Sequence, residues 1–451
     1  MGDKSWVVQI NEKLKHSNPS EESHLWKKRS IYRVPACVKD INSKAYKPQV
    51  VSFGPYHHGE DQLMPMEEHK QRALLQFLRR CKKPFEDFVK AMEEVGGDLF
   101  EAYERPDERW TDRGRFLQLM ILDGCFMLEI LRTATDSFSK HDYAENDPIF
   151  SPHGTLHMVP YIKRDMLMLE NQLPLRVLER LITVESGITV EGGTSVEGGK
   201  SKHVDQIHRL ILRFYAPTRS IPATTVLSLH VLDMFRKSFL QGPSKRSAHP
   251  SHNYPRNDTN DIIRSAMELN EAGIRFKTSR SDSLEDISFH HGVLYLPPIV
   301  VDDVTESMFL NLMAFERLHV GAGNQVTSYV FFMDNIIDSS KDVALLNSKG
   351  IIQNAVGSDK AVAKLFNSLS KDVHRKVNKY CRKSWNMWRA NLIHTYFRSP
   401  WAFLSLAAAI FLLALTIAQT VYTILPYYNN SNSAPPQSPP IFPPPPASSP
   451  F

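Results

Sequence analysis

Apolar side chains recur at three- and four-residue intervals through much of the first 370 residues, the spacing of helices that bury one face. Pro65 and two acidic residues open a helix at Met64, and a more apolar helix is expected over 115–131. Two short helices follow Ser340 and Ser358, and the second has one apolar stripe formed by Ala361, Val362, Leu365, Phe366 and Leu369. The pattern predicts a mainly α body.

Strand-like runs are few. Three short runs have the β-branched and aromatic content of strands: 287–290, 293–296 and 299–301. Because the first two flank the turn residue Gly292, they predict a small β-hairpin element. The segments 184–203 and 241–260 have the composition of loops, and we expect both to be insertions in one body over 25–370.

One apolar run near the C-terminus differs from all others. Residues Ala402 to Leu425 carry no charge, and at about 1.5 Å per residue a helix of this length would cross a hydrocarbon core of about 30 Å. Trp401 stands at one end and tyrosines stand at the other, as is typical of membrane interfaces. The sequence therefore predicts a single-pass, tail-anchored protein with a transmembrane helix over 401–425 and a Pro-rich extracytosolic tail over 426–451.

The distribution of charge gives this segment an orientation. The whole chain carries a net charge of +5, yet eight basic side chains and one acidic side chain give +7 between Lys371 and Arg398, which leaves −2 for the remainder. By the positive-inside rule, this predicts a cytosolic body and a C-terminus outside the cell or in a lumen. We expect the plasma membrane rather than the endoplasmic reticulum.

Residues 371–400 combine that charge with apolar positions at helical spacing, which predicts a basic amphipathic juxtamembrane helix. The helix could lie on an anionic bilayer, or its apolar stripe could pack on the body while the charges face solvent. The residues expected at the membrane interface are Arg375, Lys376, Lys379, Arg382, Lys383, Trp385, Trp388 and Trp401. Nucleic acid is not expected as a partner, since this charge would be tethered at a membrane.

Small and hydroxyl-bearing residues share one side of the predicted transmembrane helix, which permits close contact between helices. The candidate contact face comprises Ser405, Ala409, Thr416, Thr420 and Thr423. One expectation is a homodimer through this face; the alternative is that the hydroxyls bond back to their own helix. The Pro-rich tail is interpreted as a short extended stub, with contact to a matrix or a proline-reading partner as its alternative.

Few groups indicate catalysis. Four isolated cysteines without a Cys-x-x-Cys pair argue against a zinc ribbon, a redox motif or a disulfide scaffold. Asp123 and Glu170 lie in apolar surroundings, where a carboxyl can act as an acid or base but is more often paired and structural. Glu170–Gln172 resembles a polar knot at a helix junction, and His57 and His58 lie in what we interpret as a fixed turn. We expect no catalytic residue, no cofactor and no metal.

Conserved-looking passages occur along the chain in this order: IYRVP (31–35), VSFGPYHHG (51–59), MEEHKQRALLQFL (66–78), MILDGCFMLEIL (120–131), RDMLMLENQLPLRVLERL (164–181), FHHGVLYLPPIVVDD (289–303), NLMAFER (311–317) and the stretch 328–369. Together they resemble the plant-specific domain-of-unknown-function 247 family, over roughly residues 25–425. The resemblance implies a mostly helical, membrane-anchored plant protein with no assigned enzyme activity. It also implies kinship with grass proteins that are linked to pollen-side self-incompatibility.

We therefore expect a mainly α protein with a flexible N-terminus over 1–24, a large helical cytosolic body with a small β-hairpin element, and one C-terminal transmembrane helix. These features favour a membrane-anchored, non-enzymatic protein-interaction module in plant signalling or cell recognition. Its expected partners are the lipid bilayer and an unknown protein bound by the body. The alternative is a membrane-tethered enzyme of unrecognised type, which would require Asp123, Glu170, His57 and His58 to converge on one pocket.

Overall fold

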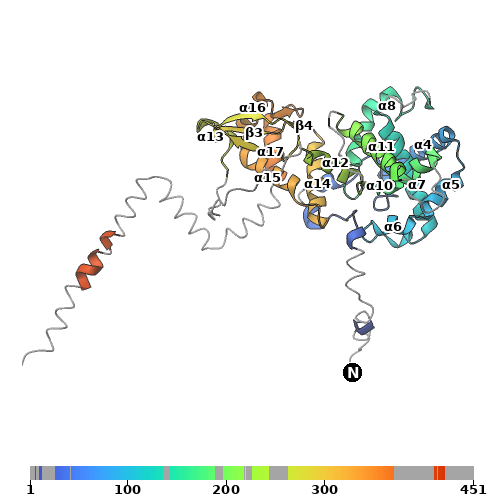
Figure 1. The fold of residues 1–451 in the computed structure, drawn as a ribbon, viewed down its shortest axis with the longest axis horizontal. Helices are drawn as coiled ribbons and strands as arrows, with labels where there is room; N and C mark the ends of the chain where they lie inside the picture. Colours follow the sequence, from blue (N-terminus) through green and yellow to red (C-terminus); the bar gives the residue numbers. More distant parts are fainter. Residues whose placement is uncertain are drawn as a thin grey trace, which may run out of the picture. The chain divides into compact units, whose positions relative to one another are not determined.

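The computed structural model describes residues 6, 10–12, 26–40, 42–135, 142–187, 197–217, 219, 226–242, 263–369, 411–413 and 415–421. Contacts between residues divide the chain into two compact units, Met1–Asp372 and Val373–Phe451. The first unit contains the expected body, and Figure 1 shows its elements.

The first unit is mainly helical, as the apolar periodicity predicted. Its helices are α3 (Ala36–Lys39), α4 (Pro65–Cys81), α5 (Phe85–Glu93), α6 (Gly96–Glu101), α7 (Arg113–Arg132), α8 (Pro152–His157), α9 (Val159–Asp165), α10 (Leu175–Ser186), α11 (Glu197–Tyr215), α12 (Val231–Leu240), α13 (Ala266–Glu271), α14 (Thr305–Leu318), α15 (Gln325–Ile336), α16 (Ser340–Ser348) and α17 (Asp359–Leu369). Short 3-10 turns are η1 (Ser43–Tyr46), η2 (Asp61–Leu63) and η3 (Glu108–Trp110). The strands are β1 (Arg275–Thr278), β2 (Ser288–His290), β3 (Val293–Leu296), β4 (Ile299–Val301) and β5 (Ile352–Asn354).

The four helices expected within the body are present as α4, α7, α16 and α17, and local signals explain where three of them begin. Pro65 occupies the first turn of α4, and the Asp112 carboxylate accepts from backbone N–H groups at the start of α7. Ser339 and Asp342 form a capping box at α16. Helix α7 is buried on nearly every side because α4, α5, α10 and α11 all pack against it. It forms the centre of the helical part on the right of Figure 1.

The expected hairpin is confirmed, within two small sheets. Strands β2 and β3 pair antiparallel with His290 opposite Val293, and His291 and Gly292 between them both have positive φ, at 51° and 74°. Such a two-residue loop matches the twist of a hairpin. The sequence did not predict β1, which pairs parallel with β3, or β5, which pairs parallel with β4. Helix α11 begins at Glu197, so helix occupies the last part of the segment 184–203 that was expected as a loop.

The expected transmembrane helix is corrected by the structure. The described residues of the second unit, 411–413 and 415–421, are helical. No helix within the described parts of the chain is both long enough and apolar enough to cross a membrane. The longer described piece rises about 10 Å, against about 30 Å for a hydrocarbon core. This finding overturns the predicted span, and with it the tail anchor and the single-pass membrane location inferred from it.

Most residues singled out near the C-terminus lie outside the described residues. This applies to the expected juxtamembrane helix with all its interface residues, to the Pro-rich tail, to Trp401, and to Ser405, Ala409 and Thr423. Thr416 and Thr420 are described, and their hydroxyls donate to the carbonyl oxygens of Leu412 and Thr416 at 2.8 and 2.7 Å. These two side chains therefore bond back to their own helix. Nearly all of the expected flexible segment 1–24 and of the expected loop 241–260 also lies outside the described residues.

Candidate functional site

The described residues between Ser30 and Glu60 form the short helix α3, the turn η1 and otherwise turns and extended stretches, and part of this segment is buried in the body. Ile31, Val51 and Phe53 are fully buried, so the backbone N–H groups beside them are withdrawn from water and need partners. Six buried polar side chains bond to this segment or to the adjoining junction between α9 and α10: Asp123, Asp165, Glu170, Asn171, Gln172 and Asn311. We call these six residues the polar core.

Asp123 faces the turn at Gly54 from helix α7. One carboxylate oxygen accepts from the Gly54 N–H at 2.8 Å, and the other lies 2.6 Å from Nζ of the fully buried Lys70. Lys70 also contacts Glu67, at 2.7 Å. Burial raises the pKa of Asp123 to about 6, and Lys70 acts against that shift. Asp123 therefore belongs to a buried charge cluster that fixes the turn.

This turn requires glycine. Gly54 has a φ of +72°, and a Cβ there would lie 2.7 Å from the Tyr103 hydroxyl and 2.8 Å from the Gln172 carbonyl oxygen. Both distances are shorter than any ordinary contact, and the backbone conformation itself disfavours other residues. The close approach is what places the Gly54 N–H against Asp123.

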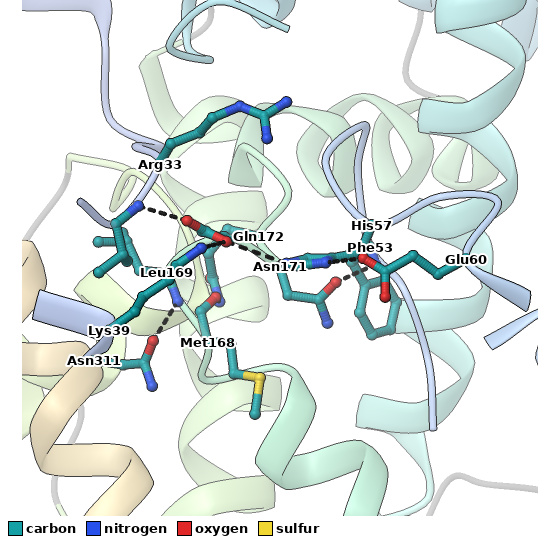
Figure 2. A network of polar contacts seen from close by, with 12 residues as sticks. Arg33, Lys39, Phe53, His57, Glu60, Met168, Leu169, Asn171, Gln172 and Asn311 are labelled. Atoms are coloured by element: carbon teal, nitrogen blue, oxygen red, sulfur yellow. Dashed lines mark hydrogen bonds and ion pairs between the residues drawn. The ribbon is translucent and has the colours of Figure 1, made fainter. Parts of the chain in front are cut away.

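Glu170 binds the other side of the same segment. Its Oε1 accepts from the Val34 N–H at 2.5 Å, and its Oε2 lies 2.8 Å from Lys39 Nζ and 3.4 Å from His57 Nε2. Figure 2 shows Lys39 and His57 reaching this group from two sides. Burial acts to raise the pKa of Glu170, but the interactions with His57 and Lys39 outweigh it, so the pKa is lowered. His57 also contacts Glu60, through Nδ1 at 2.7 Å.

The remaining members of the polar core pair mostly with backbone groups. Asp165 Oδ2 accepts from the N–H groups of residues 49, 50 and 51 at 2.7–3.1 Å. Asn171 accepts from the Phe53 N–H at 2.7 Å and donates to the Val51 carbonyl oxygen at 3.0 Å. Asn311 accepts from the Leu169 N–H at 2.9 Å, as Figure 2 shows. The polar knot expected at Glu170–Gln172 is thus present at the α9–α10 junction.

Two of the residues named for the enzyme alternative, Asp123 and Glu170, bind backbone N–H groups of the same buried segment. Asp123 and Glu170 bind the turn at Gly54 and His57, and both carboxylates are at most 3% exposed. These two carboxylates do not line the cleft of about 810 Å³ that is described below, and His57 and His58 do not line it either. These contacts match the structural interpretation of the two carboxylates.

His58 adjoins His57 in the chain but contacts different groups: its Nδ1 lies 3.9 Å from Glu67 Oε2, and Glu67 also contacts Lys70. The His58 ring packs edge-on against Trp110 with centroids 5.4 Å apart, and burial lowers the pKa of His58. Within the described residues, no group of three or more His, Cys, Asp or Glu side chains is arranged to hold a metal ion.

A different site opens where α9, α11, α12 and β4 meet. It is a cleft of about 810 Å³, a volume typical of small-molecule sites, and two basic residues line it: Lys163 of α9 and Arg219, which follows α11. The sequence did not indicate this cleft, because its lining comes from segments between residues 133 and 353. Each of those segments by itself reads as an ordinary helix or loop.

Aromatic rings connect the two cations of the cleft. Lys163 Nζ lies 5.3 Å from the Tyr215 ring centroid, and Arg219 Cζ lies 4.0 Å from that of Phe239. Between them, the Tyr215 and Phe235 rings are 5.1 Å apart and the Phe235 and Phe239 rings are 4.8 Å apart. We call Tyr215, Phe235 and Phe239 the aromatic wall. Its two ends thus carry positive charge beside an open volume.

Comparison with known proteins places these features in a family context. The model of the family DUF247, described as a plant protein of unknown function, matches residues 31–415. The UPF0481 protein At3g47200 of Arabidopsis thaliana is 32% identical over 432 residues, covering 88% of this chain and 87% of that protein. The putative UPF0481 protein At3g02645 of the same plant is 23% identical over 513 residues, covering 92% and 93%. No solved structure matches the chain.

Proposed function

Because this chain belongs to the DUF247 family of plant proteins of unknown function, we propose its function from its own side chains: it is a non-enzymatic protein-interaction module. One observation carries this proposal. The three carboxylates of the polar core, Asp123, Asp165 and Glu170, are engaged by basic side chains and backbone N–H groups of the same chain, so they offer no open group to a substrate. The earlier expectation of a role in plant signalling or cell recognition stays a prediction.

The partner would bind beside the cleft, where three exposed apolar side chains either line it or are next in sequence to residues that do. Leu156 on α8 and Tyr161 on α9 are 68% and 53% exposed, and they adjoin Thr155 and Pro160, which line the cleft. Val300 lines the cleft itself and is 54% exposed. We call Leu156, Tyr161 and Val300 the apolar rim. Large apolar side chains exposed close together are typical of protein–protein contact surfaces.

A photoreactive amino acid at position 161 tests this location. The full chain carrying benzoylphenylalanine in place of Tyr161 is added to a plant extract and irradiated, and we expect discrete protein adducts. Leu75 on α4 is the matched control, because it has the same exposed fraction of 53% but does not line the cleft. Identical adducts at both positions, or none at position 161, would contradict the proposal.

A catalytic role for Asp123 would contradict the non-enzymatic proposal and can be tested directly. A carboxyl with a pKa near 6 suits proton transfer when it reaches a substrate. If the purified full chain turned over a metabolite, and Asp123→Asn abolished turnover without changing the unfolding curve, the non-enzymatic proposal would be wrong.

A further inference from the structure

The cleft contains a cation, Lys163, that makes no hydrogen bond or ion pair through its side chain within the described residues. We propose that it binds a small organic monoanion with an aromatic or aliphatic body, whose carboxylate, sulfonate or phosphate group contacts Lys163. The inference goes beyond the protein-interaction role and does not depend on it.

Lys163 is the first step of the argument. Within the described residues, no hydrogen bond or ion pair reaches its Nζ, which instead lies near the faces of Phe214 and Tyr215 at 5.5 and 5.3 Å. The Asp302 carboxylate acts on Lys163 only through space and already accepts from the Thr305 hydroxyl at 2.7 Å and from the Val304 N–H. An ammonium group that is partly withdrawn from water and has no carboxylate in direct contact is costly, and a bound anion would lower that cost.

The charged residues that line the cleft are Lys163, Arg219, Asp282 and Asp302, so a second negative group on the ligand would meet two carboxylates and only one cation without an ion pair. Arg219 is already neutralised, since its Nε lies 2.8 Å from Asp282 Oδ2. Its Nη1 is buried and has no hydrogen-bond partner among the described residues. That N–H group is therefore free to donate to a neutral acceptor, such as a carbonyl or an ether oxygen, at the end of the ligand away from Lys163.

The space between the two cations suits an apolar body. The aromatic wall runs from Lys163 to Arg219, and rings or alkyl chains laid along it would contact three aromatic side chains. A volume of about 810 Å³ accommodates a drug-sized molecule. Charge at one end, apolar contact in the middle and a single free donor at the far end together define the ligand class.

Two fluorescent probes that differ by one charged group test the proposal on the full chain. Anilinonaphthalene sulfonate carries the anion, and phenylnaphthylamine is its neutral counterpart. We expect Lys163→Met to weaken binding of the sulfonate about tenfold while leaving the neutral probe unchanged. Lys163→Arg, which keeps the charge, should bind the sulfonate within about threefold of the natural protein.

A second pair of variants locates the bound probe. Val300→Trp fills part of the cleft from an exposed position and should weaken binding of both probes, whereas Val320→Trp, at a 92% exposed position that does not line the cleft, should weaken neither. Unfolding curves establish that each variant is folded. If the curve of Lys163→Met differs from that of the natural protein, Lys163→Gln is used in its place. The proposal is overturned if Lys163→Met weakens both probes alike or neither, or if the natural protein binds neither probe up to about 1 mM.

Discussion

The polar core and the cleft place charged side chains in two opposite situations within one body. In the core, Asp123 and Glu170 each meet a lysine and a backbone N–H at 2.5–2.8 Å. In the cleft, Lys163 meets aromatic faces and, within the described residues, no carboxylate. Burial of a charge is therefore not enough to mark a functional site. An enclosed charge with partners stabilises the fold, whereas a charge without partners beside open volume is available to a ligand.

The largest effect is expected from removing Lys70, the cation that pairs with Asp123 of the polar core. Lys70→Met leaves Asp123 buried without its counter-charge and should lower the free energy of unfolding by about 4 kcal/mol at pH 8. The loss should shrink toward pH 5. Asp123, whose pKa is already raised to about 6 and rises further without Lys70, then takes up a proton and no longer carries a buried charge. Urea unfolding at several pH values measures both effects.

Lys28 supplies the matched control for this prediction. Like Lys70 it contacts two acids, Asp98 at 2.9 Å and Glu101 at 2.7 Å, but this cluster is exposed to solvent. Lys28→Met should leave the unfolding midpoint almost unchanged. If the two variants lost equal stability, enclosure of the charge would not be what distinguishes the polar core.

The turn that carries the core should be nearly as sensitive as the charge cluster. Gly54→Ala must adopt a positive φ and also displace the Tyr103 hydroxyl or the Gln172 carbonyl, so we expect a loss of about 3 kcal/mol. Gly292→Ala isolates the cost of the positive φ, so the difference between the two variants gives the cost of the displacement. Gly292 has nearly the same φ, +74°, but a Cβ there has no atom within 4 Å. Its loss should be about 1 kcal/mol in the same urea titration, and equal losses would contradict the close approach at Gly54.

These two regions also show how far the sequence alone could predict the molecule. Helices α4, α7 and α16 and the β2–β3 hairpin follow local signals, such as Pro65 at a first turn and Gly292 in a two-residue loop. The Glu170–Gln172 junction was predicted because its polar residues interrupt an apolar run. Composition misled at 401–425, where an uncharged run predicted a span that no described helix supplies.

What the sequence could not predict depends on partners far along the chain. Asp165 looks like an ordinary helix-end residue, and its role as an acceptor for residues 49–51 appears only when segments more than 100 residues apart are brought together. Strand β1 is likewise recognised only through its parallel neighbour β3. The cleft is the extreme case, since Lys163, Arg219 and Phe239 belong to different segments and none lies in a recognisable motif.

A smaller effect is expected at the other carboxylate of the core, and it depends on pH. The folded state lowers the pKa of Glu170, so its stabilisation is complete above the ordinary pKa of about 4.3 and is lost as pH falls through the lower folded value. Glu170→Gln should cost about 2 kcal/mol at pH 7 and flatten the loss of stability below pH 4.5. Unfolding midpoints between pH 3 and 7 measure the slope. If the stability of the variant fell with pH below 4.5 as steeply as that of the natural protein, the fold would not be stabilised by the ionised form of Glu170.

The smallest predicted change in stability is a gain rather than a loss, and it concerns Lys163 in the cleft. Burial lowers the pKa of Lys163, which means that the folded protein disfavours the charged ammonium. Removing the charge in Lys163→Met should therefore raise the free energy of unfolding by about 0.5 kcal/mol at pH 7, whereas the substitutions of Lys70, Gly54 and Glu170 should lower it. Lys341→Met, at an exposed position on α16, should change nothing. The gain should shrink as pH rises from the lowered pKa of Lys163 in the fold toward the ordinary value of about 10.4, above which the amine is neutral in both the folded and the unfolded protein. A loss of stability instead would mean that Lys163 supports the fold as Lys70 does, and the contrast between the two regions would fail.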